Sequence, residues 1–254
     1  MNATHELVHP DEKRKHADVL RSKQMDFLLW LLMVDLTIDA EPQPQQELQT
    51  FVHEHPNEPL VFSMVPHTGH PDSLYVYKAI EHLTPEIISS LKFVSAKDTW
   101  SSWMSRMLAR VVAGEPYLFD RETLTMESMR AQIQEMKQIL RPENELAKPE
   151  SLAIYPQGTR TIGAPIANLP AVVAGEADVP LAILNIYGAE RVMPKVPKGT
   201  QTAQIINILI QRMHTWKSRH QVTIRLMDFI PADTHRKEKK ERLMAAHTTP
   251  FASE

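Results

Sequence analysis

The sequence predicts an α/β fold, a single-domain sandwich in which a mixed β-sheet is covered by helices. Short apolar segments alternate along the chain with longer segments whose apolar residues recur at helical spacing, and this alternation is typical of a sheet with helices on its faces. The chain has 254 residues, of which 43% are hydrophobic and 23% charged. That length and composition are sufficient for one substantial core and are unlike those of a disordered chain.

The first element expected is a helix over residues 11–38, whose basic beginning leads into the apolar run FLLWLLMV. A turn follows at 39–46, because two prolines interrupt the pattern. Strands are predicted at 59–65, 91–96, 116–120, 151–156, 179–186 and 221–229. Further helices are predicted at 74–83, 99–112, 122–140, near 200–218 and in the charged tail. This divides the chain into an N-terminal helical segment (1–45), an α/β domain (46–232) and a charged C-terminal tail (233–254).

Composition excludes several classes of function. A net charge of −3 argues against a nucleic-acid-binding protein that relies on bulk charge. The chain has no cysteine, which rules out disulfides, thiolate metal ligands and an acyl-cysteine intermediate, and which fits a reducing, cytoplasmic compartment. The longest apolar run, Phe27 to Val34, is too short to cross a bilayer, which needs about 20 residues. It is expected to be a core helix, or else to lie in a membrane surface.

The stretch VPHTGHPDSLY contains two histidines and an aspartate in six positions, His67 through Asp72. A zinc site could use His67, His70 and Asp72 with help from His53, but their spacing does not match the helical His-Glu-x-x-His pattern. A serine hydrolase using Ser73 is disfavoured because the chain has no Gly-x-Ser-x-Gly elbow. The simplest interpretation is a dyad in which the Asp72 carboxylate holds one ring nitrogen of His67 and the other nitrogen acts as a general base.

Further segments in a fixed order accompany this His-x-x-x-x-Asp block. They are LFDR at 118–121, YPQGTRT at 155–161 and VPLAI at 179–183, with Lys97 ahead of the first of them. In this order and spacing the chain resembles the glycerophospholipid acyltransferases, a family that includes the 1-acylglycerol-3-phosphate acyltransferases. The resemblance extends over about residues 60 to 190.

The resemblance implies transfer of a fatty acyl group from acyl-CoA or acyl carrier protein to a hydroxyl of a glycerophosphate or lysophospholipid-like acceptor. His67 is then the general base and Asp72 its partner, with no metal and no cofactor. Arg121 is expected to bind an acceptor phosphate through its bidentate guanidinium, although an ion pair with Asp120 is the alternative. The substrate-binding residues expected are Arg121, Gln157, Gly158, Thr159 and Arg160. Glycine at 158 also allows backbone amides to approach an oxyanion closely.

Three departures from the family pattern lie near these blocks. Pro66 stands where the family usually has Asn, Gly69 where it commonly has Ser, and Gln157 where it has Glu. They put the acceptor in question more than the reaction, and they leave open a catalytically impaired, lipid-binding member of the family. A metal-dependent hydrolase using the His67 and His70 cluster is the third hypothesis.

The ends of the chain bear on where an amphiphilic substrate would be met. EKRKH near one end, HRKEKKER near the other and the apolar run at 27–34 could form a peripheral membrane surface, on the inner face of a membrane. The alternative is that these charges belong to solvated helix faces.

Overall fold

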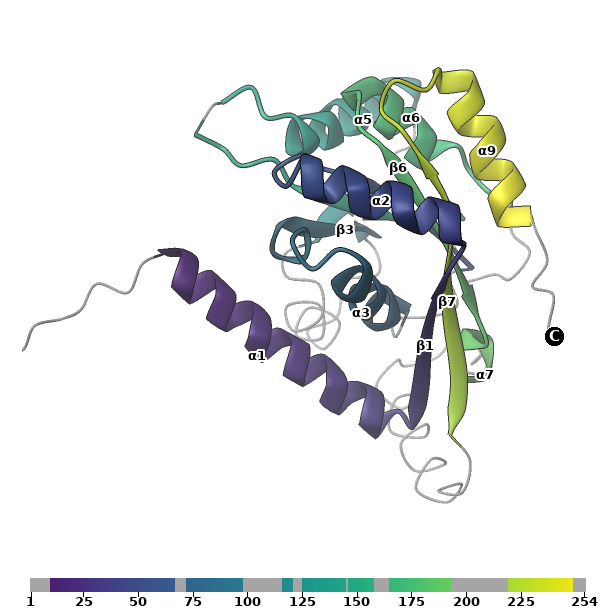
Figure 1. Cartoon of the computed structure of the whole chain (residues 1–254). Coiled ribbons are helices and arrows are strands. Elements are labelled where there is room, and N and C mark those ends of the chain that lie inside the picture. The colour runs from purple at the N-terminus through teal and green to yellow at the C-terminus, as the bar shows by residue number, and fades with distance from the viewer. Residues whose placement is uncertain are drawn as a thin grey trace, which may run out of the picture.

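The computed structural model describes residues 10–66, 72–97, 116–120, 125–144, 146–157, 165–192 and 219–248, with side chains from residue 19 onward. Within this part of the chain one seven-stranded sheet, in the order β1-β7-β6-β2-β5-β3-β4, forms the centre of the fold (Figure 1). The strands are β1 (Val34–Ala40), β2 (Val61–Val65), β3 (Leu91–Ala96), β4 (Tyr117–Phe119), β5 (Ser151–Ile154), β6 (Leu181–Tyr187) and β7 (His220–Ile230).

The sheet is mixed. Strands β6, β2, β5, β3 and β4 are parallel to one another, whereas β7 pairs antiparallel with β6, and β1 pairs parallel with β7. The helices of the described residues are α1 (Pro10–Leu31), α2 (Pro42–Glu54), α3 (Asp72–Leu83), the 3₁₀ turn η1 (Ile88–Ser90), α5 (Met126–Leu140), α6 (Leu169–Ala177), α7 (Ala189–Val192) and α9 (Arg236–Thr248). The predicted α/β class is therefore confirmed.

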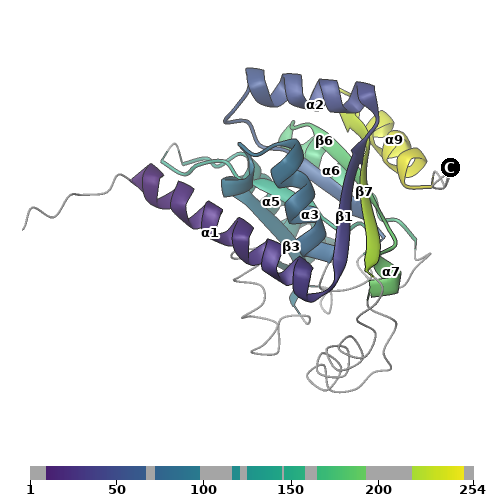
Figure 2. The same cartoon turned by 60° about the horizontal axis from the view of Figure 1, so that its bottom comes forward.

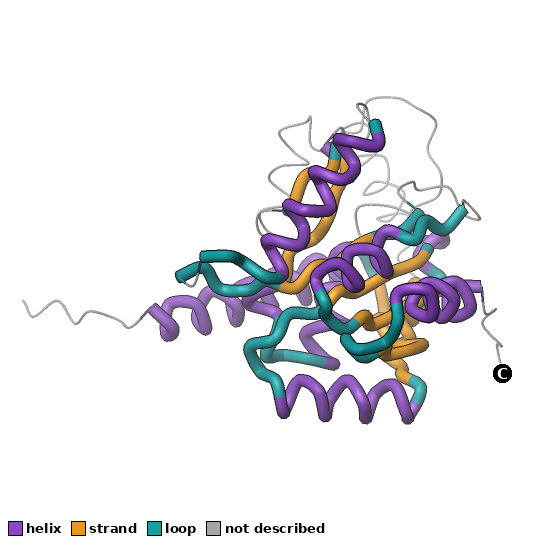
Figure 3. Tube along the Cα trace, turned by 90° about the horizontal axis from the view of Figure 1, so that it is seen from above, coloured by secondary structure: helices purple, strands orange, loops and turns teal. Residues whose placement is uncertain are grey.

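Two buried clusters, one on each face of the sheet, make up the core. Successive strand residues alternate between them: Phe62 and Met64 of β2 belong to the cluster under α1, α2 and α3, whereas Val61 belongs to the cluster under α5, α6 and α9. This period of two is what a sheet buried on both faces requires. Figure 2 shows α1 and α9 on opposite sides of the molecule, and Figure 3 shows the strands with helices on either side.

The connections between parallel strands reverse direction at one point of the sheet. From β2 the chain passes through α3 to β3, across the position of β5, whereas from β5 it passes through α6 to β6, across the position of β2. Helices α3 and α6 lie on opposite faces of the sheet, because two right-handed crossovers that run in opposite directions along a sheet place their helices on opposite faces. The reversal falls between the neighbouring strands β2 and β5, and the crevice outside the carboxyl ends of two such strands is where open α/β sheets bind ligands.

The predicted N-terminal helix was wrong at its end. Helix α1 ends at Leu31, and residues 34–40 form β1, which is an edge strand of the same sheet. Met33, with φ of 54°, lies in the turn between them. The predicted linker at 39–46 is also wrong in its second half, because α2 begins at Pro42, in the first turn where proline costs no hydrogen bond. Residues assigned to a separate N-terminal segment thus contribute to the main sheet.

The other elements lie close to their predicted positions, with two exceptions. Helix α6 was not predicted, since LPAVVAGEA is apolar on nearly all sides and shows no clear stripe. The predicted helices at 99–112 and 200–218 lie outside the described residues. The tail predicted from 233 is helical in α9, which packs against α6, β6 and β7.

Candidate active site

The sequence motifs converge on one edge of the sheet. Strands β2, β5, β3 and β4 are neighbours and parallel, so their carboxyl ends meet at the same edge. Pro66 follows β2, Tyr155 follows β5, Lys97 follows β3 and Asp120 follows β4. Each of the first three blocks thus begins at or near the end of one of these strands. The first and third blocks follow β2 and β5, the neighbouring strands between which the connections reverse.

Asp72 is the first residue of α3, and its side chain faces the protein interior. The residue is only 1% exposed. A carboxylate at the amino end of a helix is stabilised by the helix dipole and by the amides of the first turn. A buried carboxylate held in this way has the fixed position that a partner of a general base needs.

Tyr155, in the third block, lies beside Asp72 and Ser73 of the first block. Its ring packs against the core beneath α3, and its hydroxyl is buried. Burial and the neighbouring Asp72 carboxylate raise the pKa of the Tyr155 phenol well above 10, although a hydrogen bond with Ser73 acts in the other direction. The phenol therefore remains protonated at neutral pH and is a permanent hydrogen-bond donor next to Asp72. Two motifs separated by some 80 residues of sequence are thus in contact.

The end of β4 is fixed by a glutamine of α5. The backbone N–H of Asp120 donates to Oε1 of Gln132 at 2.7 Å, and Nε2 of Gln132 donates to the carbonyl of Asp120 at 3.2 Å. Gln132 is buried, so this paired contact holds the main chain in place directly before position 121. Nζ of Lys97 lies 3.5 Å from Oδ2 of Asp120, which joins the end of β3 to the end of β4. Lys97 is therefore an ion-pair partner of Asp120.

Two of the predicted site residues are described by the structure. Asp72 begins α3, and Gln157 lies just beyond β5 and is half-buried. The other predicted site residues lie outside the described residues: His67, Arg121, Gly158, Thr159 and Arg160. Their positions in the sequence place them immediately after residues at this edge, since His67 follows Pro66, Arg121 follows Asp120 and Gly158 follows Gln157.

His53, one of the residues of the metal hypothesis, is in the last turn of α2, from which a short loop leads to the amino end of β2. The first block begins in the sequence after Pro66, which follows the carboxyl end of the same strand. Among the described residues, no group of three His, Asp or Glu side chains could hold a metal ion.

No family model matches this sequence, and no curated protein is similar enough to count as a relative.

A second polar array, which the sequence did not reveal, lies on the other face of β2. Nε2 of His247 is 2.8 Å from Oγ of Ser63, and Nδ1 of His247 is 2.7 Å from Oδ1 of Asn185. Nδ2 of Asn185 donates to the carbonyl of Ala246 at 3.0 Å and to the hydroxyl of Tyr187 at 3.2 Å. Because Oδ1 of Asn185 only accepts, the Nδ1 atom of His247 carries the proton, and Nε2 accepts from the Ser63 hydroxyl.

The order Ser63, His247, Asn185 is that of a nucleophile, base and orienting group, but the geometry serves a structural purpose. Ser63 lies in the middle of the sheet and has no exposed surface. A nucleophile without access to solvent cannot attack a substrate. The array instead fastens the last turn of α9 to β2 and β6. Burial lowers the pKa of the His247 imidazole from 6.5 to about 3, so the ring is neutral at physiological pH.

The basic stretch of the tail is also largely structural. Lys239 is buried and donates to the carbonyls of Val179 and Ala232 at 3.2 and 2.8 Å. Arg242 makes a bidentate contact with Asp228, with distances of 2.9 and 2.5 Å. These cations bind within the fold, and α9 lies on the opposite face of the sheet from α1. The two basic segments therefore do not form one surface.

No helix in the described part of the chain has the length and apolar character needed to cross a membrane.

Proposed function

We propose that this protein is an O-acyltransferase that moves a fatty acyl group from a thioester, acyl-CoA or acyl carrier protein, to a hydroxyl of a glycerophosphate or lysophospholipid-like acceptor. The observation that carries the proposal is the meeting of the first and third motifs at the crevice between β2 and β5. There Tyr155 lies beside Asp72, at the position where sheets of this topology bind ligands.

In the proposed reaction His67 takes the proton of the acceptor hydroxyl. The oxygen attacks the thioester carbonyl and forms a C–O bond. The C–S bond then breaks, and the imidazolium returns its proton to the leaving thiolate. Asp72 fixes the imidazole tautomer and stabilises the imidazolium, as the carboxylate does in a hydrolase triad. Acyl transfer in this reaction is direct, without a protein nucleophile; the absence of cysteine excludes an acyl-cysteine intermediate.

Backbone amides around Gly158 are proposed to stabilise the oxyanion of this step. Arg121, Gln157, Thr159 and Arg160 are proposed to bind the acceptor. Among these, Arg121 follows in the sequence directly after Asp120, whose backbone is held by Gln132, and this supports the choice of Arg121. A peripheral position on the inner face of the membrane is part of the proposal, since both the acceptor and its product are amphiphilic.

The departures at Pro66 and Gln157 favour one competing hypothesis, a lipid-binding protein with impaired catalysis. The two differ in thioester consumption. The enzyme consumes acyl thioester in the presence of its acceptor, whereas the binding protein retains lipid without turnover.

The test is mass spectrometry of products after incubation with mixed acyl-CoA and a cell lipid extract. We expect acylated product from the natural protein, and a loss of about 10²–10⁴-fold in turnover on His67→Ala, the typical contribution of a general base. His235→Ala, which changes an exposed histidine of the tail, serves as the matched control and should retain full activity. Near-normal turnover by His67→Ala would eliminate the dyad mechanism.

A further inference from the structure

Helix α1 carries an apolar stripe that faces away from the protein. The stripe is formed by five side chains that are between 39% and 59% exposed: Val19, Leu20, Phe27, Trp30 and Leu31. Their spacing places them on one side of the helix. Met25 and Leu29, on the other side, are buried against the core. The apolar run of the sequence is thus divided between the core and the surface.

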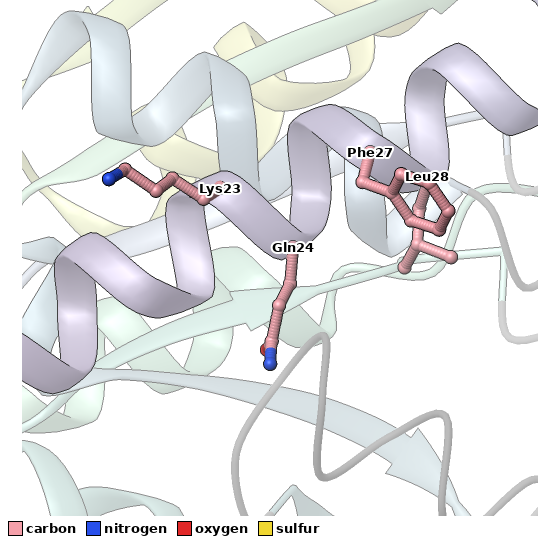
Figure 4. Close-up of a pocket in the computed structure, with 4 residues that line it drawn as sticks. All are labelled: Lys23, Gln24, Phe27 and Leu28. Atoms are coloured by element: carbon pink, nitrogen blue, oxygen red, sulfur yellow. The ribbon is translucent and has the colours of Figure 1, made fainter.

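The stripe has the composition of a membrane-interface helix. The rings of Phe27 and Trp30 stack with centroids 5.9 Å apart, and Lys23, also exposed, lies one turn before Phe27. Lys23, Gln24, Phe27 and Leu28 line a shallow hollow on the helix surface (Figure 4). Aromatic rings beside a long cationic side chain suit the headgroup region, where rings lie among the acyl chains and an ammonium reaches the phosphates.

The stripe leads to the edge of the sheet that carries the candidate active site. Asp26 of α1 binds Lys78, in the middle of α3, at 2.9 Å, and Trp30 lies one turn further along α1. Strand β1 follows α1 directly and runs opposite to β6, β2, β5, β3 and β4. It therefore begins at the edge of the sheet where those strands end, and the carboxyl end of α1 is at that same edge. Asp72, at the amino end of α3, is at the same edge.

We propose that this stripe docks the protein on an anionic lipid surface, with the crevice between β2 and β5 held close to the headgroups. The inference rests on the proposed function for the choice of a lipid as occupant, and it defines where the acceptor enters. A second copy of this chain is the competing occupant, and it is distinguished by the oligomeric state in solution.

The experiment is cosedimentation of the full chain with phosphatidylcholine vesicles that contain phosphatidylglycerol. The natural protein should bind, binding should weaken as salt is added, and neutral vesicles should bind less. Phe27→Ser/Trp30→Ser should reduce the partition coefficient at least about tenfold, because two large apolar side chains no longer enter the interface. Leu146→Ser/Met244→Ser removes two exposed apolar side chains away from α1 and should bind like the natural protein.

A second measurement uses Trp30 itself. Quenching of tryptophan fluorescence by brominated lipid should decrease on Trp30→Phe, which retains an aromatic ring but removes the fluorophore. Equal loss of binding in the two double variants, or unchanged quenching, would overturn the docking surface.

Vesicle binding is independent of turnover, so the two proposals fail separately. Turnover of detergent-dispersed substrate without vesicle binding refutes the docking surface alone. Vesicle binding without consumption of any thioester refutes the acyltransferase alone. A dimer in sedimentation velocity that Phe27→Ser/Trp30→Ser dissociates would show that a second copy occupies the stripe, and would also overturn the inference.

Discussion

The buried imidazole of His247 makes the stability of this protein sensitive to acid. The ring accepts the Ser63 hydroxyl proton on Nε2 and donates from Nδ1 to Asn185, and burial lowers its pKa from 6.5 to about 3. Between these two pKa values the unfolded chain binds a proton that the folded protein does not bind. The free energy of unfolding therefore rises with pH in this window and falls as the pH is lowered below about 6.5.

The magnitude follows from the two pKa values. Between pH 8 and pH 5 the imidazole should cost the folded state about 2 kcal/mol, since each unit of pH below the unfolded pKa costs at most about 1.4 kcal/mol. For a domain whose total stability is about 5–15 kcal/mol, this is a substantial fraction. Acid should first release the last turn of α9 from β2 and β6.

The assay is denaturant unfolding at several pH values between 8 and 5, for the natural protein and for His247→Gln. The variant is less stable at pH 8, because a neutral amide does not reproduce both hydrogen bonds of the ring. Between pH 8 and pH 5, however, the free energy of unfolding of the variant should fall by about 2 kcal/mol less than that of the natural protein. His82→Gln, which removes an exposed histidine in the last turn of α3, should retain the pH dependence of the natural protein. If His247→Gln and the natural protein lose stability in parallel, the imidazole is not held neutral by the fold and the reasoning is wrong.

Two further predictions concern the acceptor site. Gln132→Ala removes the paired hydrogen bonds to Asp120, so the KM for the acceptor should rise several-fold while the KM for the acyl donor stays nearly constant. Gln138→Ala, on an exposed side of the same helix, is the control. A parallel rise of the acceptor KM and the donor KM in Gln132→Ala would show a general structural effect. Gln157→Glu restores an acceptor-only side chain, and it should shift the ratio of catalytic efficiencies toward lysophosphatidate over the best natural acceptor by about 1–3 kcal/mol. An unchanged ratio would mean that position 157 does not contact the acceptor.

The sequence alone was sufficient for the fold class and for most of the strands. Strands such as Leu181–Tyr187 are apolar at nearly every position, because both faces of the sheet are covered, and such runs are visible without a structure. It was insufficient for β1, whose residues Val34–Ala40 continue directly from an apolar helix and alternate in exposure along an edge of the sheet. It also concealed α6, which is buried on most sides and therefore lacks a polar face.

For the candidate site, residue type and order were sufficient to predict Asp72 and Gln157 as site residues, because a motif is local in sequence. The partners of those residues could not be identified in this way. Tyr155 was expected only as the first residue of the segment YPQGTRT, and its position beside Asp72 depends on the pairing of β2 with β5. Gln132 was one of several polar residues on a helix, and its contact with Asp120 depends on how α5 packs across β4.

The sequence by itself determined an α/β chain with a histidine and an aspartate placed after one strand and further motifs placed after others. Only the tertiary structure decided that those strands are neighbours, that the chain reverses direction between β2 and β5, and that α1 turns part of its apolar run outward. It likewise joined Ser63 to His247, 184 residues further along the chain. The physical reason is that strand order and helix packing are set by the burial of two whole faces of a sheet. That is a property of all the segments together, and no single segment encodes it.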